Sequence, residues 1–321
     1  MKRYLLIDGN NIAHAANGTK NKLTVGSVET TAIFGFLRQL RKQISIYGQF
    51  TPIVLWDGAS WRKMQYKDYK ENREKNDTAA AQKQKAERES TKKQIPAIQK
   101  ALQLLGVTQI KAANMEADDL AAICADRYIK QGAGVVLVSG DKDWLQLVGP
   151  NCMWFDPIND RKVRTVADLA DEKNKLGIAV KSFKQFVEMK ALMGDTGDNI
   201  PGVGGIGDKG AMEFLAEFES YSNFSNMCLT GEVDLKKLPK KFRDLAESED
   251  KRILFMRNLM LMDLRHPARP APINLKVDPG SPSIETFTLF CQRLVFKSFL
   301  TDIENWVSVF PPFKYREAAA A

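Results

Sequence analysis

The sequence predicts an α/β fold built on a parallel sheet, followed by a second region that is mostly helical. Short, continuous apolar runs are typical of strands that are buried on both faces of such a sheet. They lie at residues 4–7, 53–56 and 135–138. Between them, apolar residues recur at helical spacing over 27–47, 92–105 and 117–130. Strands that alternate with helices indicate an α/β domain over residues 1–180.

The elements after residue 180 are predicted to be helices. A glycine-rich turn at 202–210 follows a helix that begins near residue 181, and a proline-rich stretch at 267–282 precedes a last helical region at 284–306. We therefore expect a second domain over 181–321. In the first domain, Ser27 is the expected N-cap of the helix at 27–47, and Gly48 is its expected end.

The composition limits the classes of function. The chain has 321 residues and a formal net charge of +8, which favours polyanionic partners. Four widely spaced cysteines without a CxxC pair, and only two histidines, argue against a zinc site or a disulfide framework. The N-terminal apolar run is too short for a signal peptide, and no stretch approaches the roughly 20 apolar residues of a membrane helix. We expect a cytoplasmic protein.

A strongly basic segment interrupts the α/β pattern at residues 62–94. Apolar residues are nearly absent from it after Tyr69, so we expect an exposed insertion that is helical or partly disordered. Its eleven basic residues are Arg62, Lys63, Lys67, Lys70, Arg73, Lys75, Lys83, Lys85, Arg88, Lys92 and Lys93.

Acidic residues follow each of the three predicted strands. Asp8 follows the first strand, Asp57 the second, and Asp141 and Asp143 the third. In open α/β sheets ligands bind at the carboxyl ends of the strands, so these acids should converge. Two further groups are expected to join them, one at a helix start and one on a turn. They are Glu116, Asp118 and Asp119, and Asp195 and Asp198.

Nine carboxylates in one pocket would have to protonate or bind cations. An oxygen-only set suits Mg²⁺, with Mn²⁺ as a substitute, and its size predicts two ions. The alternative for each acid is structural: Asp118 and Asp119 could favour a helix N-terminus, and Asp8 and Asp57 could be turn residues. Four groups at equivalent ends of elements favour the metal site.

The sequence resembles the 5′ nuclease, or flap endonuclease, family, which includes the 5′-nuclease domain of bacterial DNA polymerase I and free-standing phage exonucleases. The resemblance runs from Leu6 to about residue 265. Its most specific segments are Glu116-Ala117-Asp118-Asp119, Ser139-Gly140-Asp141-Lys142-Asp143 and Gly194-Asp195-Thr196-Gly197-Asp198-Asn199-Ile200-Pro201-Gly202-Val203. It implies one metal site formed by Asp8, Asp57, Glu116 and Asp118, and a second formed by Asp141, Asp143, Asp195 and Asp198, with Asp119 in the same network.

The resemblance also gives the basic segment a role. It implies an arch over the active site through which a single strand passes, with Lys70 and Arg73 at the scissile phosphate. Cations there would stabilise charge that develops on the phosphate oxygens. The expected DNA contacts of the arch are Tyr69, Lys83, Lys85 and Arg88; a solvated helix face and packing of the tyrosine are the alternatives.

The glycine-rich turn lacks the Lys-Ser/Thr order of a Walker motif and follows a helix, so it is not a dinucleotide fingerprint. Its glycines would let backbone amides approach a phosphate at the next helix start. It resembles the helix–turn–helix duplex-binding element of 5′ nucleases, which implies a K⁺ ion held by its carbonyl groups. The expected DNA contacts are Gly202, Gly204, Gly205, Gly207 and Lys209.

Together these features predict a PIN-like nuclease core with a helical arch and a helical duplex-binding region. The implied reaction is phosphodiester hydrolysis by metal-activated water, as a 5′-3′ exonuclease and flap endonuclease in RNA-primer removal. Expected substrates are branched, nicked or flapped DNA and RNA–DNA duplexes with a free 5′ end. We expect a free-standing monomer from a phage or a bacterium, with single-strand-binding protein as a partner and no membrane contact.

Three rival functions were weighed. A non-catalytic junction-binding protein would lack metal-binding acids, and none is missing. A haloacid-dehalogenase-type phosphatase would need Asp-x-Asp where Asp8 is followed by Gly9-Asn10. A single-strand RNase with the same core would not need the long arch or the glycine-rich turn.

Overall fold

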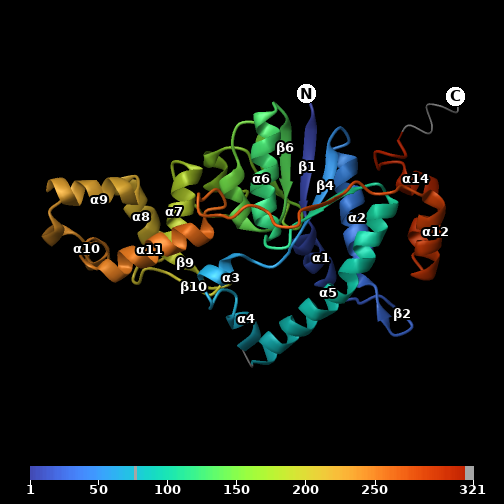
Figure 1. Ribbon diagram of the computed structural model, residues 1–321, viewed down its shortest axis with the longest axis horizontal. Coiled ribbons are helices and arrows are strands. Elements are labelled where there is room, and N and C mark those ends of the chain that lie inside the picture. Colours follow the sequence, from blue (N-terminus) through green and yellow to red (C-terminus); the bar gives the residue numbers. More distant parts are fainter. Residues whose placement is uncertain (76–77, 315–321) are drawn as a thin grey trace.

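The computed structural model describes residues 1–75 and 78–314. Its centre is a seven-stranded sheet in the order β11-β5-β4-β1-β6-β7-β8 (Figure 1). The five inner strands are parallel, and β8 and β11 pair antiparallel at the two edges. The strands are β1 (Arg3–Asp8), β4 (Thr51–Trp56), β5 (Thr108–Lys111), β6 (Gly134–Val138), β7 (Cys152–Asp156), β8 (Arg161–Val163) and β11 (Lys276–Asp278). The α/β prediction is confirmed.

Side chains on each inner strand alternate between two hydrophobic layers, as the twofold period of a strand requires. Leu5 and Ile7 face one layer, and Leu6 faces the other. The first layer is covered by α1 (Gly9–Asn17), α2 (Thr31–Ile46) and α5 (Ala79–Leu104), and the second by α6 (Ala117–Lys130) and η1 (Lys142–Leu147). The sheet is therefore buried on both faces, which explains the continuous apolar runs.

The strand order changes direction at β1. The chain builds β1, β4 and β5 outward on one side, then places β6 and β7 on the other. Loops after β1 and β6 consequently leave in opposite directions and open a crevice at the carboxyl ends of the strands. This end of the sheet carries the predicted acidic residues.

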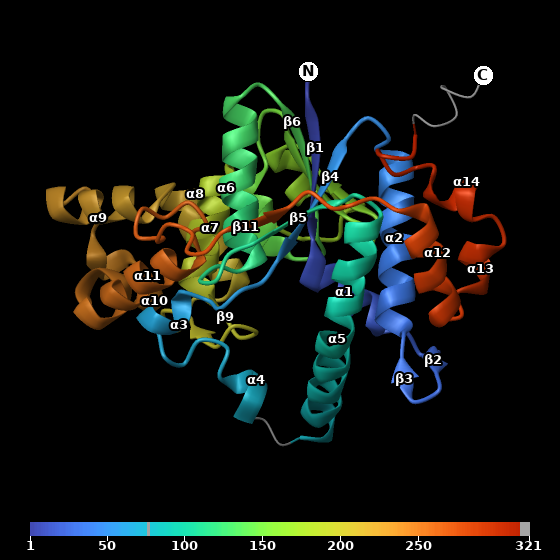
Figure 2. The ribbon, with the colours of Figure 1, turned by 45° about the vertical axis from the view of Figure 1, so that its right-hand side comes forward.

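The helical region packs beside the second layer. It consists of α7 (Phe183–Met193), the hairpin β9 (Gly194–Asp195) and β10 (Ile200–Pro201), α8 (Asp208–Phe218), α9 (Tyr221–Thr230), η3 (Leu235–Lys237), α10 (Lys240–Glu247) and α11 (Glu249–Met262). Phe214, Phe218 and Phe255 belong to the same hydrophobic cluster as the sheet residue Leu137. Figure 2 shows these helices grouped on one side of the sheet.

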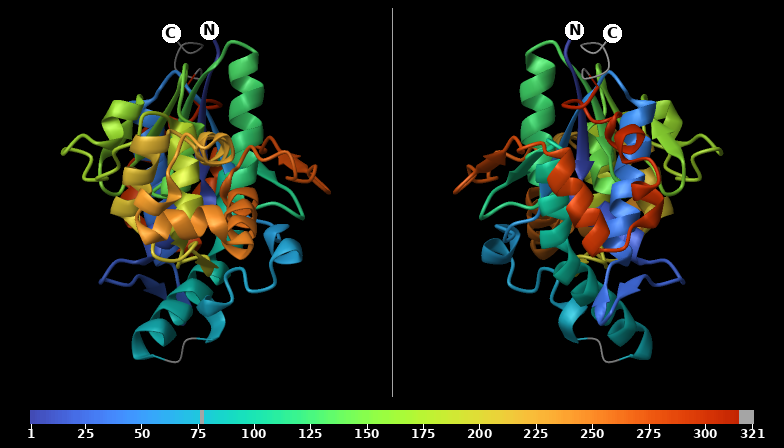
Figure 3. Two further views of the ribbon diagram at one scale, coloured as in Figure 1. Left: turned by 90° about the vertical axis from the view of Figure 1, so that its left-hand side faces the viewer. Right: turned by 90° about the vertical axis from the view of Figure 1, so that its right-hand side faces the viewer.

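The last part of the chain returns to the α/β core, so residues 181–321 are not one helical unit. Strand β11 pairs with β5 through Val277 and Ile110. The helices α12 (Ile284–Arg293), α13 (Lys297–Leu300) and α14 (Ile303–Val307) share a cluster with α2 and α5 through Phe287 and Trp306. In Figure 3 they lie on the opposite side of the sheet from the helical region.

The basic segment projects from the end of the sheet where the strands finish (Figures 1 and 2). It contains α3 (Arg62–Gln65), α4 (Asn72–Lys75) and the first half of α5, which begins after the N-cap Thr78. The helix predicted at 92–105 is the second half of α5. The segment is not wholly exposed as expected, because Arg62 and Tyr69 are buried.

One further detail differs from the predictions. The helix expected at 27–47 begins at Thr31 with Thr30 as its N-cap, because the preceding residues form a hairpin of β2 (Thr24–Val25) and β3 (Val28–Glu29). The remaining short elements are β8 and η2 (Val166–Leu169). No helix in the described part of the chain is long and apolar enough to cross a membrane.

Candidate active site

Asp8 stands at the junction of β1 and α1. One carboxylate oxygen accepts the Asn11 amide at 2.9 Å and so caps α1, and the other accepts the Ser139 hydroxyl at 2.8 Å. The same Ser139 oxygen accepts the Asp141 amide at 3.0 Å. One serine therefore ties the ends of β1 and β6 together and fixes the two predicted acids relative to each other.

Asp57 and Asp118 are held just as firmly. The Asp57 carboxylate accepts the Ala117 amide at 2.8 Å, at the first turn of α6. The Asp118 carboxylate accepts the Trp144 indole N–H at 2.6 Å. Because a half-buried side chain that accepts such bonds cannot rotate freely, the carboxylates at this end of the sheet are preorganised.

These acids raise one another's pKa. Burial, followed by the neighbouring Asp57, raises the pKa of Asp8 to about 8. Burial, followed by Asp141 and Asp8, raises the pKa of Asp118 well above its usual value. Burial also raises the pKa of Asp57 and Asp141. Such a group stays ionised only when cations join it.

Glu116 lies beside this group but has cationic partners. Its carboxylate accepts hydrogen bonds from Tyr69 at 3.0 Å and Arg62 at 3.1 Å, and it contacts the Lys70 ammonium. Burial alone would raise the pKa of Glu116, but Lys70 and Arg62 lower it to about 2. Lys70 itself has a left-handed backbone, with φ at 58°. Strained backbones of this kind cluster at functional sites.

Asp119 lies beside Glu116 and is paired with Arg62. Arg62 donates to both of its oxygens, at 2.9 Å and 3.0 Å, and the Trp61 indole donates at 3.3 Å. Asp119 also accepts the Glu116 amide, closing the capping box of α6. With its oxygens so occupied, Asp119 does not fit the expected role of a metal ligand and instead positions Glu116.

The remaining acids form a second group around a lysine. Lys190 on α7 contacts Asp143 and lies 3.2 Å from Asp195. Asp198 accepts the Tyr69 hydroxyl at 2.9 Å and Arg73 at 2.6 Å. A small pocket is lined by Asp118, Asp143, Asp195 and Asp198 together, so the two groups of acids meet.

The donor set fits hard divalent cations. It consists of carboxylate oxygens without a histidine or cysteine, the type of ligand that Mg²⁺ prefers. In the described part of the chain no three of these side chains already converge tightly enough to hold an ion. Side-chain cations of Lys70, Arg73 and Lys190 pair with the acids instead. Metal binding would therefore exchange some of these contacts for metal contacts.

A basic groove runs from these acids along α5. It has a volume of about 1020 Å³, and Asp57 and Glu116 line it together with a set of cationic side chains. The cations are Lys63, Lys70, Arg73, Lys85, Arg88 and Lys92. Lys85 and Arg88 thus lie where predicted, whereas Lys83 is exposed outside the groove. Tyr69 is 2% exposed, so the expected stacking on bases does not fit this conformation.

The glycine-rich turn lies between β10 and α8. Gly204 and Gly205 have φ values of 83° and 72°, which side chains rarely adopt. Lys251 and Lys241 flank these two glycines. Gly202 has a packing role instead, because a Cβ there would lie 2.2 Å from the Met193 carbonyl oxygen. At the other end of the turn lie Gly207, which is the N-cap of α8, and Lys209. Both residues are exposed.

The sequence-based prediction missed several residues of the site. Arg62 was counted among the exposed cations, and Lys190, Lys241 and Lys251 were not singled out. Lys190 precedes Asp195 by five residues on the helix that leads into the acidic turn. That spacing could have identified Lys190 from the sequence. Lys241 and Lys251 could not be identified in this way, because they reach the turn only when α10 and α11 fold back over it.

Two family models match consecutive parts of the chain. The model described as 5′-3′ exonuclease, N-terminal resolvase-like domain, matches residues 3–177. The model described as 5′-3′ exonuclease, C-terminal SAM fold, matches residues 182–281.

Curated relatives and a solved structure agree with these matches. Flap endonuclease Xni of Shewanella sediminis is 33% identical over 245 residues, covering 74% of this chain and 86% of the relative. The 5′-3′ exonuclease of Aquifex aeolicus is 27% identical over 311 residues, covering 95% of this chain and 96% of the relative. Bacteriophage T5 flap endonuclease, solved as a pseudo-enzyme-product complex with DNA and metal ions, shares the fold: its TM-score is 0.59 at 23% identity, over 95% of this chain and 99% of that one. The chain therefore belongs to the 5′-3′ exonuclease family and is a nuclease of the 5′-3′ exonuclease and flap endonuclease type.

Proposed function

We propose that this nuclease hydrolyses phosphodiester bonds near the 5′ end of branched or nicked DNA, using two Mg²⁺ ions at the carboxyl ends of β1, β4 and β6. The observation that carries the proposal is a group of four acids with raised pKa, one buried and three half-buried, beside a groove lined by cations. The acids would bind divalent metal ions, and the neighbouring side-chain cations would bind the phosphate groups of the nucleic acid.

The acids divide into two sets. Asp8, Asp57, Glu116 and Asp118 would hold one ion; Asp141, Asp143, Asp195 and Asp198 would hold the other. The ions would supply an activated water and stabilise charge on the attacking and leaving oxygens. Mn²⁺ has the same preference for oxygen ligands and should substitute. The metal-bound T5 structure supports this assignment by its shared fold.

Lys70 and Arg73 are proposed to bind the scissile phosphate. Both line the groove and both already contact acids of the site, at Glu116 and Asp198. When a divalent ion takes over those acids, the two cations are free to turn toward a phosphate. Arg73 can engage two phosphate oxygens at once, and Lys70 places a point charge near the reacting oxygen.

Substrate binding is assigned to two surfaces. A single 5′ strand would follow the groove past Lys85 and Arg88, held by its backbone. Duplex would contact the glycine-rich turn, where the amides of Gly204 and Gly205 and the nearby Lys241 and Lys251 suit phosphates, and a K⁺ ion could bind the turn carbonyls. These contacts read no base sequence, so specificity would come from the shape of the branch.

This assignment places the enzyme in RNA-primer removal and flap processing in the cytoplasm of a bacterium or an infected cell. RNA–DNA duplexes with a free 5′ end are proposed as further substrates, and single-strand-binding protein as a partner. The named activities of the Shewanella and Aquifex relatives support a replication role.

One assay tests the proposal. A 5′-labelled flap, a nicked duplex and an RNA–DNA hybrid are each incubated with Mg²⁺ and with a chelator. With Mg²⁺ we expect the flap to release short 5′-labelled products that end in a 3′ hydroxyl, which leaves a 5′ phosphate on the remaining strand. We expect no such products with the chelator. Cleavage from the 3′ end, or cleavage that persists in chelator, would overturn it.

A further inference from the structure

A second large groove lies on the outer face of α2, away from the nuclease site. It has a volume of about 1220 Å³, and its walls come from α1, the loop after β7, and the C-terminal helices α13 and α14. None of the residues that line it lines the catalytic groove. Ile12 and Ala15 face it from one side of α1, whereas His14 faces the catalytic groove from the other.

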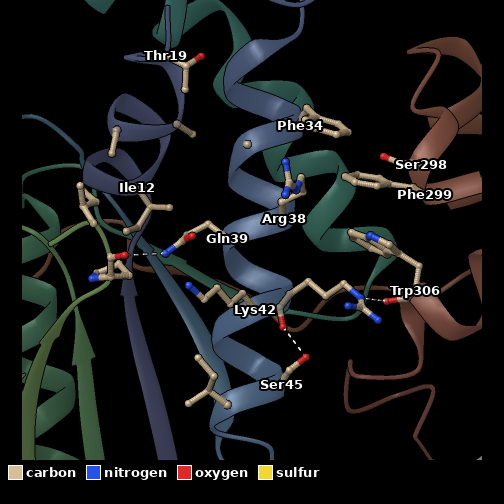
Figure 4. Close-up of a pocket in the computed structure, with 17 residues that line it drawn as sticks. Ile12, Thr19, Phe34, Arg38, Gln39, Lys42, Ser45, Ser298, Phe299 and Trp306 are labelled. Atoms are coloured by element: carbon tan, nitrogen blue, oxygen red, sulfur yellow. Dashed lines mark hydrogen bonds between the residues drawn. The ribbon is translucent and has the colours of Figure 1, made fainter. Parts of the chain in front are cut away.

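The groove is cationic. Arg38, Arg41 and Lys42 of α2 line it, and Figure 4 shows Arg38 and Lys42 on that helix. No aspartate or glutamate is among the residues that line the groove. Arg41 is committed to structure, because it donates to the carbonyl groups of Trp306 and Asn305 at 2.9 Å and 3.1 Å. Arg38 and Lys42 have no carboxylate partner in the described part of the chain. One turn apart on a helix, they present two charges on the same face.

Most of the remaining lining residues are apolar, and the others carry neutral polar side chains. Ile46 and Ile158 are 55% and 53% exposed at its edge, and Ala15 and Ala16 of α1 also line it. Phe34 forms part of the opposite wall, with the Arg38 guanidinium 5.6 Å above its ring. A volume above the roughly 300–1,000 Å³ of small-ligand pockets suits several side chains of an extended or helical segment.

We propose that this groove, defined by Arg38, Lys42, Ile46 and Ile158 with the walls around them, binds an acidic segment of a partner protein that also carries apolar side chains. Carboxylates would pair with Arg38 and Lys42, while apolar side chains would cover Ile46 and Ile158. Electrostatic complementarity of this kind selects the partner and speeds association.

The lining favours a peptide over a nucleic acid. Single-stranded nucleic acids bind through exposed aromatic faces on which bases stack. Here Phe299 and Trp306 are buried, at 1% and 8% exposure, and only Phe34 is partly accessible. A phosphate backbone would satisfy Arg38 and Lys42 but would leave the apolar edge uncovered. The proposal is independent of the nuclease reaction, because it uses no residue of that site.

The test is a display selection of short random peptides on the full-length protein, with counter-selection on Arg38→Glu/Lys42→Glu. The matched control is Arg127→Glu/Lys130→Glu, which reverses two exposed charges on α6, across the sheet from α2. Arg38→Gln/Lys42→Gln provides a milder variant. Flap cleavage and circular dichroism of all three variants should match the wild type.

The expected result is enrichment of peptides that combine Asp or Glu with apolar residues. They should bind the Arg38→Glu/Lys42→Glu variant about tenfold or more weakly and the α6 control normally. Peptides that bind both double variants equally, or no enrichment, would overturn the proposal. Binding of a single-stranded oligonucleotide is measured as well, in the presence of a chelator. The proposal would also fall if the oligonucleotide bound more tightly than every selected peptide and if Arg38→Glu/Lys42→Glu abolished that binding.

Discussion

The guanidinium of Arg62 lies 2.9 Å from the carboxylate of Asp119, and both side chains are almost completely buried. This ion pair sits directly behind Glu116, which Arg62 also contacts at 3.1 Å. Arg62, one of the eleven basic residues of the arch segment 62–94, thus anchors the base of that segment to the start of α6. The position of Glu116, a candidate metal ligand, therefore depends on a buried ion pair behind it.

Removing this cation should destabilise the protein strongly. In Arg62→Met the acids Asp119 and Glu116 would keep buried charges without their partner, which typically costs about 3–5 kcal/mol. Chemical denaturation measures the loss in free energy of unfolding. Lys237→Met is the control, because Lys237 pairs with Asp234 at the surface and such pairs contribute about 1 kcal/mol or less. Equal losses in the two variants would contradict the anchoring role.

Lys70→Ala should slow cleavage by orders of magnitude while weakening DNA binding only modestly. The ammonium group would act on charge that develops during the reaction, so its removal affects the rate more than the affinity. Single-turnover rates on a flap substrate measure the effect, with binding followed separately in Ca²⁺. Lys67→Ala removes an exposed lysine nearby that does not line the groove. A Lys70→Ala rate within a few-fold of this control would refute the assignment.

Divalent metal binding should release protons at mildly acidic pH. With its pKa raised to about 8, Asp8 carries a proton below that pH in the metal-free protein, and a bound cation would expel it. Calorimetric titration with Mg²⁺ near pH 6 should give heats that depend on the ionisation enthalpy of the buffer. The dependence should fade above about pH 9, where Asp8 is already ionised, and should shrink in Asp8→Asn. Identical heats in different buffers at low pH would contradict the account.

The cationic side chains of the arch fall into two classes, those that line the groove along α5 and those that lie outside it. Lys85 and Arg88 line it, and Lys83 does not. Lys85→Ala/Arg88→Ala should weaken flap binding and reduce the salt dependence of the binding constant by roughly 0.7 per lost phosphate contact. Lys83→Ala should change either quantity much less. If all three side chains contributed equally, the strand path past the groove would be wrong.

The grouping of the candidate metal-binding acids could be predicted because their positions follow from local pattern. Asp8, Asp57 and Asp141 each end an apolar run, and parallel strands bring their carboxyl ends to one edge. Strand β5 was not predicted because its residues, Thr108–Lys111, are mostly polar. Only its pairing with β4 in the folded protein identifies it as a strand. Strand β11 joins the same sheet from far along the chain, which no local pattern encodes.

The cations of the site were harder to predict. Lysine and arginine in a charged run are usually solvated, so nothing local distinguishes the buried Arg62 from its exposed neighbours. Tyr69 is similar: its burial depends on acceptors at Glu116 and Asp198, which come from distant segments. Asp119 shares a motif with two acids of the cluster, but the capping geometry of α6 turns it toward Arg62.

The central claim, that the acids at the end of the sheet hold two divalent ions, is tested most directly by counting bound Mn²⁺ by electron paramagnetic resonance. The wild-type protein with a flap substrate should bind two ions, and Asp141→Asn should retain one, bind DNA normally and fail to cleave it. A wild-type protein that binds one ion or none, or an Asp141→Asn variant that keeps two ions and full activity, would contradict the account.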